Sequence, residues 1–520
     1  MKRAFARLLV LSLLLCLAAG CSTSKEAPLP PAIRLLAVKR LVLEPAALED
    51  AEPWSRYWAE PDTVNADLTQ SPGLAYSLTV GNNTVFNGGL PAGYDLQGLI
   101  EWGKDPGLNV DILHAHGFTG AGAVVAYIDQ GVLPHREYDR ENIHITNTGN
   151  YPMSMHGPAV LSLLAGESIG VAPDADIYYL GCDSGDGYSQ LHEADCLYRV
   201  IDLNETLPEG QKIRMVAFSD NIDPSEPYVE EFRAAARACE EAGIMVWFCG
   251  ENGAVAFLPW SDKNDPGNLT PEHWGGGHGA QVCFPSAGRT VACVFDPARY
   301  VYYASGGLSW TMPYALGLYA IALSIDPGLT QTELRTIARD TADEINEGSK
   351  RVVDPVEFVA AVLERVGRNE EADVLRAEVM ARQKYLYTVV DEAAMSKEDQ
   401  RAVFDALAWI TEARVVAADA SRFADGAELY AAIEADLRER GGTLAGFQLF
   451  GEVPEPPGGE GGETPPVWHL NLGKGEYVTF FRDYLNAARA GEPDTLAEGT
   501  LFPPNRAGMA LCVAEGTLGN

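Results

Sequence analysis

Residues 122–128 read GAVVAYI, an apolar and β-branched run that ends directly before Asp129. Buried strands of a parallel sheet have this composition, and helices cover such a sheet on both faces. Segments with helical periodicity, such as YVEEFRAAARACEEAG (228–243), alternate with further runs of the same kind. Those runs are ADIYYLG (175–181), IRMVAFS (213–219) and IMVWFC (244–249). We therefore predict an α/β fold with a parallel sheet over about residues 98–368.

Two predicted helices with clear N-terminal signals end the α/β region, and the chain after it is richer in predicted helices. Thr330 and Glu333 form a capping box, and Asp354 is placed as the N-cap of a second helix. Residues 369–520 are expected to form a helix-rich domain of α/β or all-α type, whose role the sequence leaves open. Its predicted helices include EEADVLRAEVMARQKYLY (370–387), KEDQRAVFDALAWITEA (397–413) and GAELYAAIEADLRERGG (426–442), and LAGFQLFG (444–451) is a predicted strand.

The N-terminus has the layout of an export signal. MKRAFAR is basic, LLVLSLLLCL is apolar, and LAAGC ends at Cys21. The last five residues resemble the bacterial lipobox, which implies that residues 1–20 are a lipoprotein signal peptide and that Cys21 is lipidated. The protein would then be held on the outward face of a bacterial cell membrane, with residues 21–97 as a tether and N-terminal extension. A simple cleaved signal peptide is the alternative.

Charge and composition narrow the function classes. The 520-residue chain holds 73 acidic and 38 basic residues, a formal net charge of −35, which disfavours nucleic acid as a partner. Its hydrophobic content of 47% is that of a globular protein. Nine cysteines without a CxxC spacing offer no zinc motif. Short disulfide loops at Cys182–Cys196 or Cys283–Cys293 and buried free thiols are both open readings.

Three polar residues stand at positions that suit chemistry. Asp129 ends an apolar strand, where open α/β sheets place their sites. His156 begins HGPAVLSLLAG (156–166), which turns apolar and helical at once. Ser309 lies near the start of the apolar stretch GGLSWTMPYALGLYAIAL (306–323), in which Pro313 is compatible with the first turn of a helix. Taken singly, an Asp at a turn and a His or Ser at a helix start are more often structural.

Together these segments resemble the subtilisin-like serine proteases, or subtilases, over about residues 98–368. The segments that carry the resemblance are GFTGAGAVVAYIDQGVLPH (117–135), HGPAVLSLLAG, GVAPDADIYYLG (170–181) and GLSWTMPYALG (307–317). The last agrees with that family's nucleophile segment at its Gly, Ser, Pro and final Gly. The order Asp, His, Ser along the chain is the one known for subtilisin.

The resemblance implies acyl transfer by a catalytic triad. Ser309 would attack the scissile carbonyl, His156 would take and return its proton, and Asp129 would orient the imidazole. An oxyanion hole would be formed by the Ser309 amide and a side-chain amide. An ungapped count from Gly243 through GIMVWFCGENG puts Asn252 at that place, whereas anchoring on Gly250 would put Glu251 there.

Ser219 and Gly250 are the expected substrate-binding residues. MVAFSDN (215–221) resembles the family's substrate-lining strand at Ser219, but Asp220 and Asn221 depart from its usual ending. Further departures flank the triad, and we expect Asp220 and Trp310 to narrow the cleft or alter its polarity. The other departures are Gln130, Pro158 and Leu308.

The predicted function is therefore a surface-anchored serine endopeptidase acting on polypeptides. The alternatives are a catalytically silent subtilase-shaped lipoprotein that binds peptides or a partner protein, and a scaffold whose work is done by residues 369–520. GLSWT lacks the second glycine of the α/β-hydrolase elbow, and there is no HExxH or P-loop motif. No cofactor is implied, and CDSGDG (182–187) lacks the full pattern of a calcium loop.

Overall fold

A computed structural model describes residues 42–43, 63–390, 413–450, 453–454, 456 and 467–470, with gaps at 70, 92, 149–153, 183–188, 223, 258, 260, 267–268, 272–281, 295 and 346–349. By its internal contacts the chain divides into Met1–Arg40 and Leu41–Asn520, and every described residue belongs to the second unit. The predicted signal peptide, Cys21 and nearly all of the predicted helix at 397–413 lie outside the described residues.

A five-stranded sheet with the order β6-β7-β5-β8-β9 forms the first part of the fold. All of its neighbouring strands are parallel, as the sequence predicted. The four apolar runs recognised in the sequence form β5, β7, β8 and β9. The strands are β5 (Val124–Gln130), β6 (Ile143–Asn147), β7 (Asp176–Cys182), β8 (Met215–Phe218) and β9 (Met245–Phe248).

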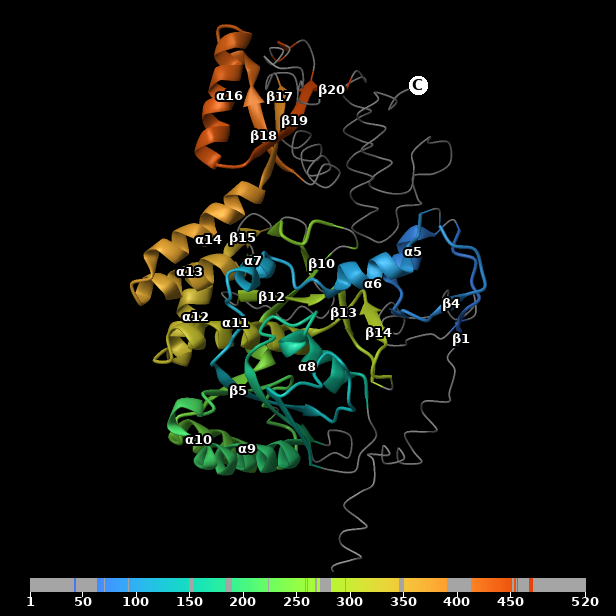
Figure 1. Ribbon diagram of the computed structural model, residues 1–520. Coiled ribbons are helices and arrows are strands. Elements are labelled where there is room, and N and C mark those ends of the chain that lie inside the picture. Colours follow the sequence, from blue (N-terminus) through green and yellow to red (C-terminus); the bar gives the residue numbers. More distant parts are fainter. Residues whose placement is uncertain are drawn as a thin grey trace, which may run out of the picture. The chain divides into compact units, whose positions relative to one another are not determined.

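Helices cover both faces of this sheet (Figure 1). Alternate residues of β5 face opposite sides, because side chains alternate along a strand. Val124, Ala126 and Ile128 belong to a core with α9 (Ser189–Thr206) and α10 (Val229–Glu241). Val125 and Tyr127 belong to a second core with α8 (His156–Ala165) and α11 (Thr311–Ile325). The sheet is thus buried on both sides, which explains its continuous apolar runs.

Two further sheets follow in the same part of the chain. A mixed sheet has the order β11-β10-β12-β16-β15, and an antiparallel sheet has the order β13-β14-β3. Residues before the predicted start at 98 take part, since β3 pairs with β14. The strands are β3 (Val80–Gly81), β10 (Gly253–Phe257), β11 (Leu269–Pro271), β12 (Val282–Ala287), β13 (Arg289–Ala292), β14 (Tyr300–Tyr303), β15 (Asp343–Ile345) and β16 (Lys350–Val352).

The remaining elements of this part are short or flank the sheets. The predicted capping box of α12 (Gln331–Asp340) and the N-cap Asp354 of α13 (Pro355–Arg365) are both confirmed. Two-residue strands form a small parallel sheet near the start of the described chain. The others are β1 (Val42–Leu43), β2 (Thr63–Val64), β4 (Val85–Phe86), α5 (Pro72–Ser77), α6 (Leu96–Lys104), α7 (Val110–Ala115), η1 (Glu209–Gln211), η2 (Cys249–Glu251) and η4 (Leu308–Trp310).

The apolar segment that carries Ser309 is a core helix. Leu308–Ile325 is long and apolar enough to cross a membrane, but 78% of it is buried within the protein. Its final motif glycine, Gly317, lies against Val171, where an added Cβ would be 2.7 Å from the valine Cβ. The GVAP segment and the Ser309 segment therefore pack together closely enough to require that glycine.

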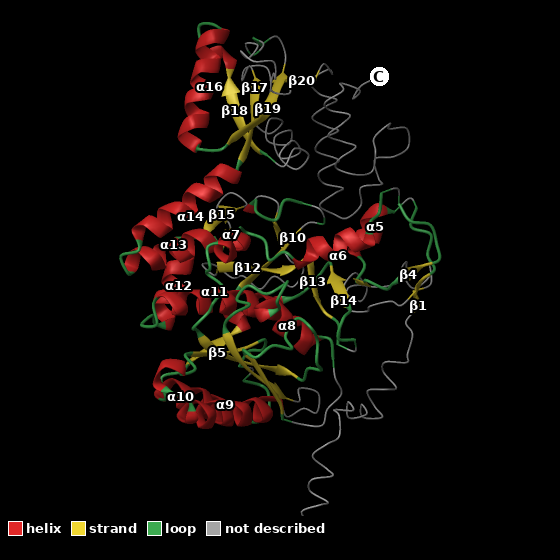
Figure 2. Cartoon of the chain, viewed as in Figure 1, coloured by secondary structure: helices red, strands yellow, loops and turns green. Residues whose placement is uncertain are grey.

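The C-terminal part contains a second fully parallel sheet, of order β18-β17-β19-β20 (Figure 2). An α/β arrangement therefore replaces the all-α alternative. The predicted helix over 370–387 is only partly correct, because α14 (Asn369–Arg382) ends before KYLY, which begins a strand. The elements are β17 (Lys384–Val390), β18 (Arg414–Asp419), η6 (Ala420–Arg422), α16 (Gly426–Arg440), β19 (Thr443–Phe450) and β20 (Val467–Leu470).

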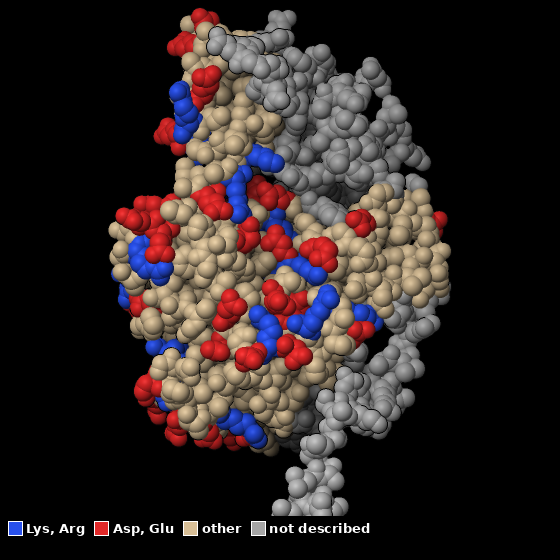
Figure 3. Space-filling view, in the orientation of Figure 1, with Lys and Arg blue, Asp and Glu red and all other residues tan. Residues whose placement is uncertain are grey.

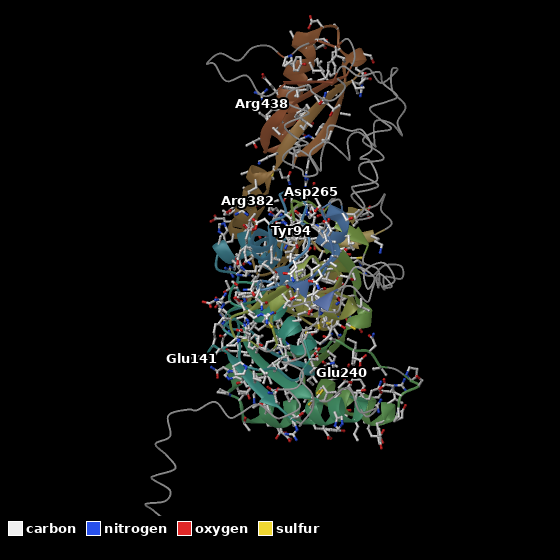
Figure 4. All side chains as sticks on the ribbon, turned by 90° about the vertical axis from the view of Figure 1, so that its right-hand side faces the viewer. Tyr94, Glu141, Glu240, Asp265, Arg382 and Arg438 are labelled. Carbon is white, nitrogen blue, oxygen red and sulfur yellow. The ribbon has the colours of Figure 1, made fainter. Side chains whose placement is uncertain are left out.

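Ion pairs tie α14 to the preceding part of the chain. Arg382, labelled in Figure 4, donates to Asp111 of α7 at 2.5 Å, and Arg376 donates to Glu357 of α13 at 3.0 Å. On the face seen in Figure 3, acidic and basic side chains are interspersed over the described residues, without a broad basic patch. This distribution agrees with the acidic balance of the sequence.

Candidate active site

Asp129 and His156 are joined by a short hydrogen bond. Asp129 lies near the carboxyl end of β5 and is 8% exposed, and His156 is the first residue of α8. The imidazole Nδ1 donates to Asp129 Oδ1 at 2.7 Å, and the same oxygen accepts the Gln130 backbone N–H at 2.7 Å. The Gln130 N–H thus holds the Asp129 carboxylate in place, and the carboxylate orients the His156 ring. Because Nδ1 carries the proton in this bond, Nε2 is the basic nitrogen of His156.

Gly157 lets α8 approach the end of β5. A Cβ at this position would lie 2.2 Å from the Gln130 carbonyl oxygen and 2.8 Å from the Tyr179 hydroxyl. Both contacts are shorter than a side chain tolerates. The Gly after His156 is therefore needed so that the imidazole reaches Asp129.

Ser309 lies in η4, directly before α11, with Pro313 in the first turn of that helix. Its hydroxyl donates to the carbonyl oxygen of Ser219 at 3.1 Å. Among the hydrogen bonds of the described residues, none joins Ser309 Oγ to His156. The two segments nonetheless pack against each other, since α8 contacts η4. Hydrogen bonds of a resting site are often absent or long and form only with substrate.

The side chains of Asn252 and Glu251 contact different parts of the protein. Asn252 is 2% exposed, and its amide Nδ2 donates to Thr311 Oγ1 at 3.2 Å, two residues after Ser309. Glu251 instead pairs with Arg335 of α12, whose guanidinium lies 4.6 Å from the ring centroid of Trp247. Asn252 therefore lies against the start of α11, and the choice between the two readings of the sequence stays a prediction.

The ends of β8 and β9 are tied together around Ser219 and Gly250. The Ser219 hydroxyl is 2.6 Å from the Tyr127 hydroxyl, and the Ser219 carbonyl also accepts the Cys249 thiol at 3.1 Å. The Gly250 N–H donates to Asn221 Oδ1 at 2.6 Å, and a Cβ on Gly250 would lie 2.3 Å from that oxygen. These hydrogen bonds fix the backbone at Ser219, whose carbonyl accepts the Ser309 hydroxyl.

The electrostatics keep His156 basic. Burial by itself lowers the pKa of His156, but the charge of Asp129, its hydrogen bond and the charge of Asp220 outweigh that effect. The pKa of His156 therefore lies above its ordinary value of 6.5. Burial also holds the pKa of Tyr127 well above 10, so its hydroxyl stays neutral.

Trp310 and Gln130, two of the departures noted in the sequence, contact neighbouring residues in the structure. Trp310 is 2% exposed and packs edge-on against Tyr303, with ring centroids 5.0 Å apart. The Trp310 ring is thus part of the core, and its expected effect on the width or polarity of a cleft stays a prediction. Gln130 accepts a hydrogen bond from the Ser154 hydroxyl, while Asp220 is exposed at the end of β8. Sequence reasoning missed Ser154, Tyr127 and Arg335, which carry no motif of their own.

The described residues hold no metal cluster and no disulfide, although the thiols of Cys182 and Cys196, one of the two pairs considered from the sequence, are hydrogen-bonded to each other. No group of three His, Cys, Asp or Glu side chains there could hold a metal ion. CDSGDG falls almost entirely outside the described residues. The six described cysteines are free and buried, and they are Cys182, Cys196, Cys239, Cys249, Cys283 and Cys293.

No protein-family model matches this chain, and no curated protein matches it. Solved structures do match about half of it. The prenylagaramide maturation protease PagA is 15% identical with a TM-score of 0.37, over 49% of this chain and 98% of that chain. A structure from the assembly of the subtilase cytotoxin SubAB is 16% identical, with a TM-score of 0.40 and coverage of 52% and 99%. MycP1 without its N-terminal propeptide is 19% identical, with a TM-score of 0.36 and coverage of 50% and 98%.

Proposed function

We propose that this protein is a serine endopeptidase that uses Asp129, His156 and Ser309. The observation that carries the proposal is the 2.7 Å bond between His156 and Asp129 at a strand end, with the Ser309 segment packed against the same helix. A buried carboxylate that fixes one imidazole nitrogen leaves the other free to accept a proton. The hydrogen bond between Asp129 and His156 is what a catalytic base requires, and a histidine with a purely structural role does not require it.

The proposed reaction gives each of these residues a role. His156 Nε2 accepts the Ser309 proton while Oγ attacks the peptide carbonyl, and the resulting imidazolium is stabilised by Asp129. The tetrahedral oxyanion would accept hydrogen bonds from the Ser309 backbone N–H and from Asn252 Nδ2, an amide group with two N–H donors, one of which is bonded to Thr311 Oγ1. Ser219 and Gly250 hold the neighbouring strand ends, along which the peptide substrate would lie. The imidazolium then protonates the leaving amine, and water hydrolyses the acyl-enzyme by the same route.

Digestion of an unfolded protein tests this proposal. The chain from residue 22 onward is incubated with reduced, alkylated casein, and peptide release is followed by mass spectrometry. We expect digestion by the wild-type sequence and none by Ser309→Ala. Ser324→Ala is the matched control, because Ser324 lies in the last turn of α11 and its hydroxyl donates to the Ile321 carbonyl of the same helix at 2.7 Å. Equal digestion by Ser309→Ala and the wild type would contradict the proposal.

A catalytically silent, peptide-binding protein is the second candidate. The observation that favours it is the hydrogen bond from the Ser309 hydroxyl to the Ser219 carbonyl instead of to His156. It predicts that the folded wild-type protein binds peptides without cleaving any of them. Peptide release that depends on Ser309 rejects this candidate.

Anchoring at the outward face of a bacterial membrane is part of the same proposal. It rests on the LAAGC segment that ends at Cys21. More than one acyl chain would make the attachment stable. Metabolic labelling with an alkyne fatty acid should mark the full-length protein and leave Cys21→Ser unlabelled. Equal labelling of the two proteins would contradict the anchor, and the protease proposal would stand independently.

A further inference from the structure

Two buried thiols, those of Cys182 and Cys196, lie in contact with each other. Cys182 is the last residue of β7, Cys196 lies in α9, and both belong to the core that α9 and α10 form with the first sheet. The two residues are only 2% and 1% exposed, and their thiols are hydrogen-bonded to each other. This thiol pair, as it is called below, takes no part in the proposed peptide hydrolysis.

Thr148 holds the two segments of the thiol pair together by contacts of its own. Its backbone N–H and its hydroxyl both donate to the carbonyl of Gly181, the residue before Cys182, at 2.7 and 2.9 Å. The same hydroxyl oxygen lies 3.8 Å from Cys196 Sγ. Because the hydroxyl proton is donated to Gly181, the Cys196 thiol is the donor to this oxygen. Thr148 therefore places Cys196 beside the end of β7, where Cys182 lies.

Two other buried thiols make a different kind of contact. The Cys239 thiol donates to the Leu197 carbonyl at 3.7 Å, and the Cys249 thiol donates to the Ser219 carbonyl at 3.1 Å. A bond to a backbone carbonyl satisfies a buried free thiol. Two sulfur atoms in contact, on segments that are already held together, can instead form an S–S bond of about 2 Å without a large movement of the backbone. The thiol pair therefore suits a covalent bond, whereas the other two thiols do not.

We propose that Cys182 and Cys196 form a disulfide bond while the chain folds, before the core closes over them. The oxidant is a disulfide compound or a disulfide-bearing protein that exchanges with thiols outside the cytoplasm. For its oxidant in the cell the inference rests on the proposed export of the chain, and it does not require that the protein hydrolyse peptides. The bond joins α9 to the end of β7, whose Gly181 pairs with Asp129 of β5.

Two thiol–disulfide exchanges form this bond. The hydrogen bond with Cys182 lowers the pKa of Cys196, so Cys196 ionises first and its thiolate attacks one sulfur of the oxidant. The other oxidant sulfur leaves as a thiolate. Cys182 Sγ then attacks Cys196 Sγ in the mixed disulfide, and the second oxidant sulfur leaves. Each leaving thiolate takes up one of the two protons that the cysteines release, so two protein thiols are oxidised and the oxidant disulfide is reduced to two thiols.

Refolding under defined redox conditions tests the thiol pair. The chain from residue 22 onward is unfolded and reduced, refolded with oxidised and reduced glutathione, isolated by size-exclusion chromatography, and unfolded again in N-ethylmaleimide. Peptide mapping should find Cys182 joined to Cys196, and Cys239 and Cys249 alkylated. Alkylated Cys182 and Cys196 in the refolded protein, or a bond from either one to another cysteine, would overturn the inference. Neither export nor hydrolysis enters this measurement, so its result is independent of the proposed function.

Thermal unfolding supplies a matched control. The wild type refolded with dithiothreitol should unfold about 5–10 °C below the wild type refolded with glutathione, because the bond restricts the unfolded chain. Cys196→Ala should lose this difference. Cys239→Ala should keep it, since Cys239 is buried in the same core and its thiol donates to the Leu197 carbonyl.

The difference between the two refolding conditions is measured within each variant, so a lower stability of either variant does not affect the comparison. A wild type with the same midpoint under both conditions, or equal differences for Cys196→Ala and Cys239→Ala, would contradict the bond. If Cys196→Ala does not fold, the peptide mapping of the wild type decides by itself.

Discussion

Two fully parallel sheets in this chain differ in what stands at their strand ends. In the sheet β6-β7-β5-β8-β9, the end of β5 carries Asp129, which is bonded to a histidine 27 residues away in sequence. In the sheet β18-β17-β19-β20, the end of β18 carries Asp419, which accepts the backbone N–H and hydroxyl of Ser421, two residues away. The same position on the same kind of sheet therefore serves a cross-fold site in one case and a local turn in the other.

The difference between the two strand ends shows what a functional site on a parallel sheet requires. Next to the first sheet, polar groups bond to segments far away in sequence: the Ser309 hydroxyl donates to the Ser219 carbonyl, and the Asn252 amide donates to the Thr311 hydroxyl. Asp419 accepts hydrogen bonds from Ser421 in its own turn, a common use of Asp at such a place. A site requires side chains that the fold brings together, and the strand end only supplies the place. Substitutions in either sheet can test this difference between the two strand ends.

The largest effect is expected from removing the charge that orients His156. Asp129→Asn should lower kcat on a cleavable peptide by about 10⁴-fold, because an amide stabilises the wrong imidazole tautomer. Asp419→Asn makes the same chemical change at the second sheet and should leave kcat unaltered. Initial-rate measurements on both variants check this prediction. Comparable losses in the two would mean that the contrast between the strand ends is not functional.

A smaller effect is expected from disturbing the approach of α8 to β5. The Cβ of Gly157→Ala would lie 2.2 Å from a backbone carbonyl, so α8 must shift and carry His156 with it. We expect a loss of roughly 1–3 kcal/mol in the free energy of unfolding and about 10²-fold in kcat. Gly210→Ala is the control, since nothing lies within 4 Å of its added Cβ. Urea denaturation and rate measurements would refute the packing argument if both variants behaved alike.

The pH profile should respond to Asp220 in a direction that the structure fixes. Protonated His156 cannot act as a base, so activity is lost as the pH falls through its pKa, which lies above 6.5. Asp220 helps to raise that pKa, so Asp220→Asn should move the acidic limb of the kcat/KM profile to lower pH. A peptide without charged side chains is the substrate for this measurement. A limb that moves to higher pH would contradict the assigned electrostatics.

The smallest effect on activity is expected from the core of the second sheet. Leu429 is fully buried there with Tyr387 and Val389. Leu429→Ala should destabilise that part by about 2–5 kcal/mol through lost burial and a cavity. The rate of peptide hydrolysis should stay at the wild-type level in the temperature range where the protein is folded. Calorimetry and rate measurements together check this, and a parallel loss of rate would show that the two sheets are functionally coupled.

Local patterns predicted the elements that carry the candidate triad. The apolar runs, the glycines and Pro313 specify β5, α8 and α11, because each depends on neighbours in sequence. The strand within 370–387 was missed, since its parallel neighbours β18 and β19 begin at Arg414 and Thr443, far along the chain. The pairing of Glu251 with Arg335 arises from packing between elements.

Covalent labelling with a fluorophosphonate tests the central claim most directly. The probe reacts only with an activated serine, so it reports the nucleophile without knowledge of the substrate. The chain from residue 22 onward should gain the mass of one probe, and peptide mapping should place it on Ser309. His156→Ala should abolish the labelling while the protein remains folded. No labelling of a folded wild-type sample, from neutral to alkaline pH, would contradict the assignment of Ser309 as an activated nucleophile.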